Sequence, residues 1–193
     1  MIEIRWHGRG GQGAKTVSQL LAGAALRSGR YAQAFPEYGP ERSGAPVKAF
    51  NRLDTKEIRL HCSIYEPDIV VVLDPTLLHA KEARVTEGLK RHGILLVNTG
   101  QTPEEIRALT GFSGRIITLD AEALARSVGT RFSNVVMLGA LARLLGDIAL
   151  EDLESEFAKL FGEKALAINV AALRAGFSAM TERLGQKPLE AIS

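Results

Sequence analysis

The chain opens with the stretch IEIRWHGRGGQGAKT, residues 2–16, and this stretch decides the fold. Its first part, Ile2 to Trp6, alternates apolar and polar residues as a half-buried strand does. Glycines at positions 8, 10 and 13 then match the pattern G-x-G-x-x-G, and apolar residues recur at helical spacing from Val17 to Ala25. A strand, a glycine-rich turn and a helix in this order predict the first unit of an α/β sheet.

The next part of the chain continues with strands. Gly29 is well placed to end the first helix, and Tyr31 to Phe35 is expected to form the second strand. Val47 to Leu53 and Glu57 to His61 are expected to pair as a hairpin around residues 54–56. Three later strands are expected at residues 68–74, 94–97 and 115–119, with helices between them. The first of these is apolar without a break, which predicts a strand covered on both faces.

Helices dominate the second half. Thr102 as cap, Pro103 in the first helical position and Glu105 three residues after the cap mark one helix start. From about residue 120 the chain is expected to be helical, with helical apolar spacing in residues 134–145 and 164–180. The sequence therefore predicts one α/β domain over residues 1–193. We expect a Rossmann-like, open, mainly parallel sheet with helices on both faces, an inserted β-hairpin and a helical C-terminal section.

Composition and charge exclude several classes of protein. Hydrophobic residues make up 46% and charged residues 24%, which is typical of a globular domain. No signal peptide and no apolar run of membrane-spanning length is seen, so a cytoplasmic location without membrane contact is expected. Residues 1–60 hold ten Lys and Arg against five Asp and Glu, a balance suited to an anionic ligand or an acidic partner. Aromatics are only 6% and no basic run occurs, so no nucleic acid is expected.

The sequence predicts neither a metal site nor a redox centre in this chain. Cys62 is the only cysteine, and a single thiolate cannot hold an iron–sulfur cluster. The four histidines show no metal-ligand spacing, and His7 and His61 are interpreted as polar residues at strand ends. No catalytic residue and no metal ligand are therefore predicted, and any redox centre is expected on another chain.

The glycine loop by itself has two interpretations. Its backbone N–H groups can bind a phosphate at the start of the helix, with Lys15 adding a charge, or the glycines can simply allow close packing of strand and helix. A dinucleotide site also needs an acid at the end of the second strand. Glu37 is near that place, but Pro36 precedes it, so it is a poor acceptor for ribose hydroxyls.

Several segments, taken together, resemble one protein family. They are residues 6–16, residues 35–47 with the sequence FPEYGPERSGAPV, residues 132–141 with the sequence FSNVVMLGAL, and Asn169 with Gly176 seven residues later. The chain is similar over nearly its whole length to the gamma subunit of pyruvate and related 2-oxoacid:ferredoxin oxidoreductases. Many relatives carry a double glycine where this chain has Ser43-Gly44, and this form is closer to the pyruvate and branched-chain types.

The resemblance implies a subunit that is not a complete enzyme by itself. The overall reaction would be oxidative decarboxylation of a 2-oxoacid, with pyruvate expected, to an acyl-coenzyme A, with electrons passed to ferredoxin. Thiamine diphosphate, Mg and the iron–sulfur clusters would belong to companion alpha, beta and delta-type subunits. This chain would supply a Rossmann-like layer beside them and help to cover coenzyme A, the co-substrate.

The residues expected to bind the cofactor are Gly10, Gly11, Gln12, Gly13, Arg42 and Ser43. The glycine loop would offer backbone and amide hydrogen bonds to a phosphate or a neighbouring subunit. The Arg42 guanidinium can hold a phosphate in two parallel hydrogen bonds, or it can form an interface ion pair. Asn134 is expected to cap a helix, with an interface contact as the alternative, and Asp74 to begin one, although its strand end is a usual ligand position.

Two other functions remain open at this point. One is a stand-alone NAD(P)-binding Rossmann oxidoreductase, which the Pro36-Glu37 sequence disfavours. The other is a purely structural docking subunit without a ligand.

Overall fold

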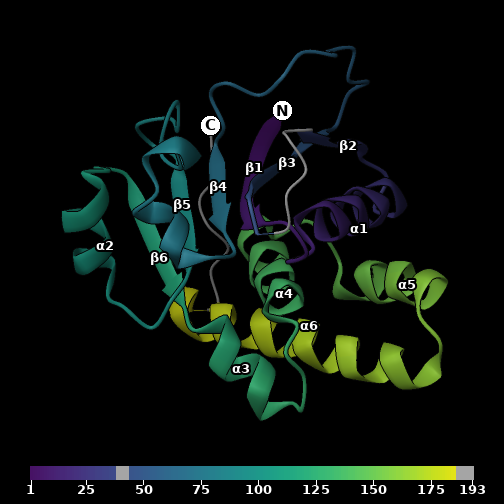
Figure 1. The fold of residues 1–193 in the computed structure, drawn as a ribbon. Helices are drawn as coiled ribbons and strands as arrows, with labels where there is room; N and C mark the ends of the chain where they lie inside the picture. The colour runs from purple at the N-terminus through teal and green to yellow at the C-terminus, as the bar shows by residue number, and fades with distance from the viewer. Residues whose placement is uncertain (38–43, 186–193) are drawn as a thin grey trace.

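Six strands form the sheet at the centre of the computed structural model, which describes residues 1–37 and 44–185 (Figure 1). The strands are β1 (Ile2–Arg9), β2 (Tyr31–Glu37), β3 (Pro46–Asp54), β4 (Ile69–Val72), β5 (Ile94–Asn98) and β6 (Arg115–Leu119). They lie in the order β2-β3-β1-β4-β5-β6. Strands β1, β4, β5 and β6 are parallel, and β3 is antiparallel to both of its neighbours. The mainly parallel sheet that the sequence predicts is confirmed.

Helices cover both faces of this sheet. They are α1 (Ala14–Arg27), α2 (Pro103–Thr110), α3 (Ala121–Ser127), α4 (Ser133–Leu145), α5 (Leu150–Leu160) and α6 (Glu163–Leu184), with short 3-10 turns η1 (Pro75–Leu78) and η2 (Lys81–Ala83). Alternate residues of a strand enter different cores. Val71 packs with α1, α4 and α6, whereas Val70 and Val72 pack with Ile106 of α2 on the other face. All four residues of β4 are buried, as predicted for a strand covered on both sides.

The predicted hairpin of residues 47–53 with residues 57–61 is wrong. β3 pairs with the preceding strand β2, from Tyr31↔Asp54 to Glu37↔Lys48, and not with residues 57–61. Residues 57–61 form no strand and are held by a side chain instead, since Arg52 Nη2 donates to the carbonyl of Cys62 at 2.8 Å and Nη1 to that of Leu60 at 3.4 Å. The apolar and polar alternation of this segment was therefore a misleading strand signal.

The connection from β4 to β5 also differs from the prediction. In place of a helix it holds the two 3-10 turns. Asp74 caps the first of them, and its carboxylate accepts from Thr76 N at 3.0 Å. Arg84 then takes a left-handed conformation with φ of 46°, and Gly88 follows with φ of 69°, so the chain turns too sharply for a regular helix. The predicted capping box of Thr102 and Glu105 is confirmed at the start of α2.

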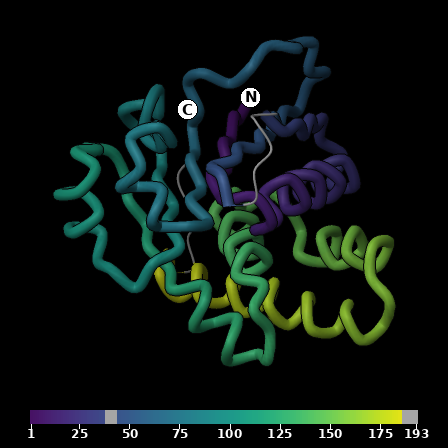
Figure 2. Tube along the Cα trace, viewed as in Figure 1, coloured from purple at the N-terminus to yellow at the C-terminus, as the bar shows by residue number. Residues whose placement is uncertain are grey.

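Helix α4 is the central helix of the molecule. It is buried over most of its length, and α6 crosses it at very short distance (Figures 1 and 2). A Cβ atom at Gly139 would lie 2.0 Å from the carbonyl oxygen of Leu173, and one at Gly176 would lie 1.9 Å from that of Val136. Glycine is therefore required at both positions for the two backbones to approach. This packing fixes the N-terminus of α4 next to that of α1. That residues 1–193 form one domain stays a prediction.

Candidate functional site

The glycine loop connects the buried end of β1 to the start of α1. Gly11 and Gly13 have positive φ angles of 93° and 78°, which glycine adopts without strain. Gly13 is the N-cap residue of α1, and no side chain of residues 1–37 and 44–185 caps this helix. The N–H groups of the first helical turn therefore lack an intrahelical acceptor and carry the positive end of the helix dipole. Lys15 is exposed in the same turn.

The side chain of Gln12 is turned back onto the protein. Its Oε1 accepts from the backbone N of Arg9 at 2.7 Å, and its Nε2 donates to Asp74 Oδ2 at 2.8 Å. Arg9 reaches the same carboxylate oxygen with Nε at 3.2 Å and the Thr76 hydroxyl with Nη2 at 2.7 Å. Asp74 does begin a helical turn, since it is the N-cap residue of η1. Its hydrogen bonds to Gln12 and Arg9 are not indicated by any local pattern in the sequence.

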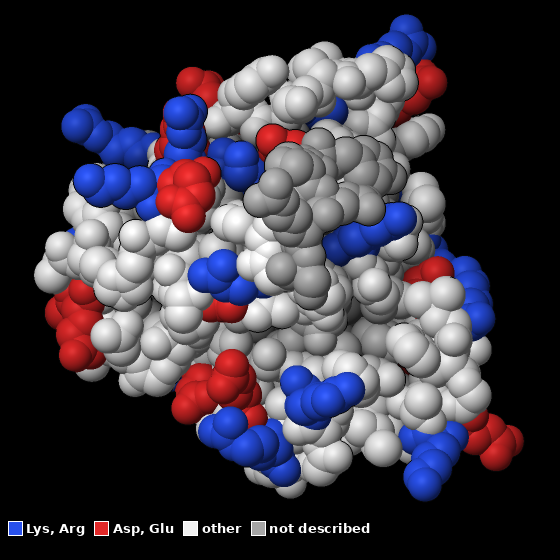
Figure 3. All heavy atoms as spheres, in the orientation of Figure 1, with Lys and Arg blue, Asp and Glu red and all other residues white. Residues whose placement is uncertain are grey.

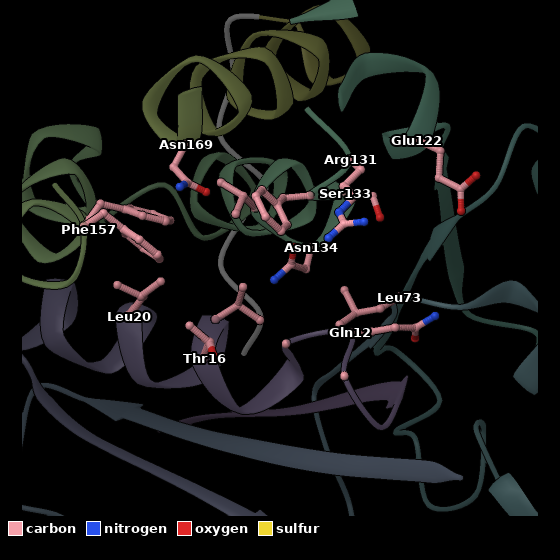
Figure 4. Close-up of a pocket in the computed structure, with 16 residues that line it drawn as sticks. Gln12, Thr16, Leu20, Leu73, Glu122, Arg131, Ser133, Asn134, Phe157 and Asn169 are labelled. Atoms are coloured by element: carbon pink, nitrogen blue, oxygen red, sulfur yellow. The ribbon is translucent and has the colours of Figure 1, made fainter. Parts of the chain in front are cut away.

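A cavity of about 480 Å³ opens beside the glycine loop. Figure 4 shows its walls: Thr16 and Leu20 come from α1, Asn134 from α4, Phe157 from α5 and Asn169 from α6. Figure 4 shows Gln12, Ser133 and Arg131 at one end of the cavity, the polar end, and Leu20 and Phe157 with Asn169 above them at the other, the apolar end, where Phe161 stacks on Phe157. One site thus offers polar donors next to a large apolar wall, which is the usual composition of a small-molecule site.

The start of α4 faces the start of α1 across this cavity. Helix α4 begins at Ser133 with Phe132 as N-cap residue, and it too has no side-chain cap. The expectation that Asn134 caps the helix is therefore wrong, because Asn134 is already inside it. Its amide lies over the glycine loop instead, so that a Cβ at Gly13 would be 2.5 Å from Asn134 Nδ2. The side chain can thus face a ligand held between the two helices.

Two further polar side chains line the cavity. Asn169 is only 3% exposed, its Nδ2 donates to Ala165 O at 2.8 Å, and within residues 1–37 and 44–185 no donor reaches its Oδ1. Arg131 has no carboxylate partner in the same ranges, whereas Glu122 at the rim pairs with Arg126 at 3.8 Å. Two uncapped helix starts and an arginine together favour an anion at the polar end.

Arg42 and Ser43 lie outside the described residues. The structure describes the segment that follows them, and this segment is bound to the glycine loop. Gly10 N donates to Ala45 O at 2.9 Å, and Arg9 Nη1 donates to Gly44 O at 3.0 Å. The roles of Arg42 and Ser43 stay predictions.

Asn98 has a supporting role that the sequence does not predict. It ends β5, and its Nδ2 donates to Leu73 O at 2.9 Å while its Oδ1 accepts from Ala121 N at 2.9 Å. These bonds tie the ends of β4 and β5 to the start of α3, so Asn98 supports the edge of the sheet at which the cavity lies. A lone asparagine after an apolar run gives no signal of this role.

No group of three or more His, Cys, Asp or Glu residues gathers to hold a metal within the described ranges. Cys62 is an exposed, free thiol. On the face seen in Figure 3, basic and acidic residues are interspersed and form no single-sign field. Searched over the same ranges, the chain has no helix with both the length and the apolar character needed to span a bilayer.

His7 is a buried residue of β1 and not a simple strand-end residue. Its side chain is 1% exposed, and its Nε2 has no hydrogen-bond partner in the described part of the chain. Burial, with the charges of Arg5 and Lys48 nearby, lowers the pKa of His7 from 6.5 to about 3. The ring is therefore neutral in the folded protein at neutral pH.

This burial predicts a loss of stability in acid. Between pH 6.5 and about 3 the unfolded chain binds a proton at His7 and the folded chain does not. The free energy of unfolding should therefore fall with falling pH, by up to about 1.4 kcal/mol per pH unit from this group. We expect His7→Gln to reduce that slope in urea titrations at several pH values. His92→Gln, at an exposed position, is the control, and an equal change in slope there would contradict the assignment.

Glu37 is not placed for a ribose. β3 lies between β1 and β2, so the end of β2 is two strand spacings, roughly 10 Å, from the end of β1. Glu37 also pairs with Lys48 across the β2–β3 ladder at 3.5 Å. The acid that a dinucleotide site requires beside the glycine loop is therefore not supplied by β2.

Comparison with known proteins gives matches along most of the chain. Residues 3–179 match the family model described as pyruvate ferredoxin/flavodoxin oxidoreductase. A pyruvate synthase subunit PorC from Thermotoga maritima is 49% identical over 181 residues, 91% of this chain and 93% of that protein. A pyruvate/ketoisovalerate oxidoreductases common subunit gamma from Thermococcus kodakarensis is 48% identical over 170 residues, 85% of this chain and 91% of that protein.

Two solved structures share the fold of this chain. The crystal structure of pyruvate oxidoreductase subunit PORC from Thermotoga maritima has a TM-score of 0.80 and 46% identity, and covers 92% of this chain and 95% of that one. A 2-oxoglutarate:ferredoxin oxidoreductase from Magnetococcus marinus, solved with 2-oxoglutarate, coenzyme A and succinyl-CoA bound, has a TM-score of 0.78. It is 21% identical, covers all of this chain and 33% of that one, and shows the fold alone.

Proposed function

The chain belongs to the pyruvate ferredoxin/flavodoxin oxidoreductase family as one of its gamma subunits, and from this premise we propose its part in the reaction. The assembly oxidatively decarboxylates a 2-oxoacid, with pyruvate the expected substrate, forms an acyl-coenzyme A and passes the electrons to ferredoxin. The observation that carries this proposal is the 49% identity to a pyruvate synthase subunit over nearly the full length of both chains.

The hard chemistry belongs to companion subunits in this proposal. Thiamine diphosphate with its Mg supplies the carbanion chemistry, and iron–sulfur clusters carry the electrons, on chains of the alpha, beta and delta type. The gamma subunit contributes binding and orientation, and it excludes water from the reacting groups. We keep the cytoplasm as the expected location of the assembly.

The cavity between α1 and α4 is the place that we assign to coenzyme A. The polar end offers the backbone N–H groups of Gly11 and Gly13, the Asn134 amide and the Arg131 guanidinium to a phosphate, whereas those of Gly10 and Gln12 bind Ala45 O and Arg9 O. The apolar end, formed by Leu20, Phe157 and Phe161, suits the less polar parts of the molecule. A phosphate held here leaves the rest of coenzyme A free to extend toward a companion subunit.

The remaining residues predicted to bind the cofactor are Gln12, Arg42 and Ser43. The side-chain amide of Gln12 and its backbone N–H both bind inside the protein, so Gln12 contributes to ligand binding by shaping the loop. Arg42 and Ser43 precede Gly44, which Arg9 binds, and we keep Arg42 as a second contact for a coenzyme A phosphate.

The two other functions explain fewer of the observations. A stand-alone NAD(P)-dependent oxidoreductase needs a ribose acceptor beside the glycine loop, and β3 separates Glu37 from that position. A purely structural docking subunit gives no reason for two uncapped helix starts and Arg131 to meet at one cavity.

Co-purification tests the assembly directly. With an affinity tag on this chain and co-expression of the thiamine-binding and ferredoxin-like chains, we expect a complex with equal amounts of every subunit. The isolated chain should bind NAD(H) or NADP(H) no tighter than about millimolar, a free energy of roughly −4 kcal/mol. Recovery of the tagged chain alone, with micromolar nicotinamide binding, would replace this proposal by the dehydrogenase.

A further inference from the structure

We propose that Gln12 and Asp74 are a positioning pair that holds the glycine loop in the shape that receives a ligand. Neither side chain is expected to touch the ligand. The contribution of the pair to coenzyme A binding rests on the proposed function, whereas its effect on the loop does not.

The Gln12 amide is fully engaged in holding the loop. Its oxygen accepts from Arg9 N, three residues back in the same loop, and its nitrogen donates to Asp74 across the sheet edge. Figure 4 shows the amide directed away from Asn134 and Asn169. Gln12 thus lies in the wall of the cavity by its position, while its polar atoms point elsewhere.

Asp74 joins the start of η1 to the glycine loop through its two oxygens. Oδ1 accepts from Thr76 N at 3.0 Å and from the Thr76 hydroxyl at 2.6 Å, and Oδ2 accepts from Gln12 and Arg9. Burial by itself would raise the pKa of Asp74, but the hydrogen bonds from Thr76 and Gln12 and the charge of Arg9 hold it below its ordinary value. The carboxylate therefore stays ionised and acts as an acceptor only.

The loop needs such a support because of its composition. Gly10, Gly11 and Gly13 have more backbone freedom than other residues, and two of them take positive φ angles here. If the loop were free, a ligand would have to order it on binding, which weakens affinity. The pair orders it during folding. Arg9 extends the same network to Gly44, so the segment after Arg42 and Ser43 is fixed to the loop as well.

The geometry allows the roles of donor and acceptor to be exchanged. Gln12→Glu places a carboxylate against Asp74, and Asp74→Asn places a donor against the Gln12 donor, so each single variant breaks the contact. In the double variant Gln12→Glu with Asp74→Asn, the new carboxylate accepts from Arg9 N and from the new amide nitrogen, while Arg9 Nε loses its acceptor at position 74. The new amide oxygen still accepts from Thr76. Gln101→Glu adds the same charge at an exposed position and is the matched control.

Hydrogen exchange of the full chain tests the pair without any ligand. We expect the two hydrogen-bonded amides of the loop, Gly10 N and Gln12 N, to exchange about tenfold faster in each single variant, the scale of one lost charge-assisted hydrogen bond. The double variant should exchange clearly more slowly than either single variant, with the part due to the Arg9–Asp74 ion pair still lost, and Gln101→Glu should leave the wild-type rate unchanged. Unchanged exchange in the single variants, or no recovery in the double variant, would overturn the inference.

Kinetics of the assembled enzyme test the functional part. The single variants should raise the apparent KM for coenzyme A about tenfold, and the double variant should raise it less than either of them. Oxoacid decarboxylation before coenzyme A enters should be unchanged. Suppose that hydrogen exchange responds to the variants as expected but the KM for coenzyme A stays the same. The pair would then order the loop without contributing to coenzyme A binding. An assembly that forms acyl-coenzyme A equally well without this chain would instead contradict the proposed function, and the exchange result would still decide on the pair.

Discussion

Gly176→Ala is expected to lower the free energy of unfolding by about 3 kcal/mol or more, which is at or above the usual upper limit for an overpacked core. The added methyl group would lie 1.9 Å from the carbonyl oxygen of Val136, and that atom belongs to the backbone of α4. Neither helix can relieve the contact by a side-chain rotation, so α4 and α6 must move apart. Gly139→Ala, with its clash of 2.0 Å against Leu173 O, should behave in the same way.

Gly23→Ala is the matched control, since it also lies inside a helix. Its new methyl group would meet the end of the Glu156 side chain at 2.6 Å, and a side chain can move. The cost of displacing the Glu156 side chain is offset by the better helix propensity of alanine, worth about 1 kcal/mol. Urea unfolding of the three variants should therefore separate Gly139 and Gly176 from Gly23. Equal stabilities would contradict the close crossing of α4 and α6.

Arg42→Ala should weaken the apparent affinity of the assembled enzyme for coenzyme A about ten- to hundredfold, or roughly 1.5–3 kcal/mol. The reason is the loss of a charge-assisted hydrogen bond to a phosphate. Arg42→Lys should recover only part of it, because an ammonium group lacks the paired donors of a guanidinium. Oxoacid-dependent decarboxylation before coenzyme A enters should be nearly unchanged. The measurement is the Michaelis constant for coenzyme A.

Subunit stoichiometry has to be measured before these kinetics are interpreted. An Arg42→Ala variant that does not assemble would favour the interface ion pair. A variant that assembles and keeps the wild-type Michaelis constant would rule out the phosphate contact. Arg59→Ala, which removes a highly exposed arginine in the same half of the chain, controls for the loss of positive charge.

Local signals in the sequence predicted most of the fold. The glycine loop between a strand and a helix, the continuous apolar run before Asp74 and the capping box at Thr102 each act within a few residues, and each is found as predicted. The predicted hairpin is wrong because residues 57–61 alternate in polarity like a strand but form none, and β3 pairs with β2 instead. Pairing of strands is a choice between distant segments, and alternation alone does not decide it.

The candidate site was predictable only in part. The spacing of residues 10–13 predicts a binding loop, and Gly11, Gln12 and Gly13 line the cavity. The Gln12 amide, predicted to offer hydrogen bonds to a phosphate or a neighbouring subunit, binds Asp74, 62 positions away. Asn134 and Asn169 line the cavity because α4 and α6 cross at Gly139 and Gly176, and no local pattern carries that information. The burial of His7 likewise depends on the segments that cover β1.

The central claim is that this chain completes a 2-oxoacid:ferredoxin oxidoreductase and serves coenzyme A in it. The most direct measurement is single-turnover formation of acyl-coenzyme A from pyruvate by the companion subunits, assembled with and without this chain, with ferredoxin as acceptor. We expect rapid product formation only when this chain is present, while decarboxylation at the thiamine proceeds in both preparations. Acyl-coenzyme A formed at the same rate without this chain would contradict the claim.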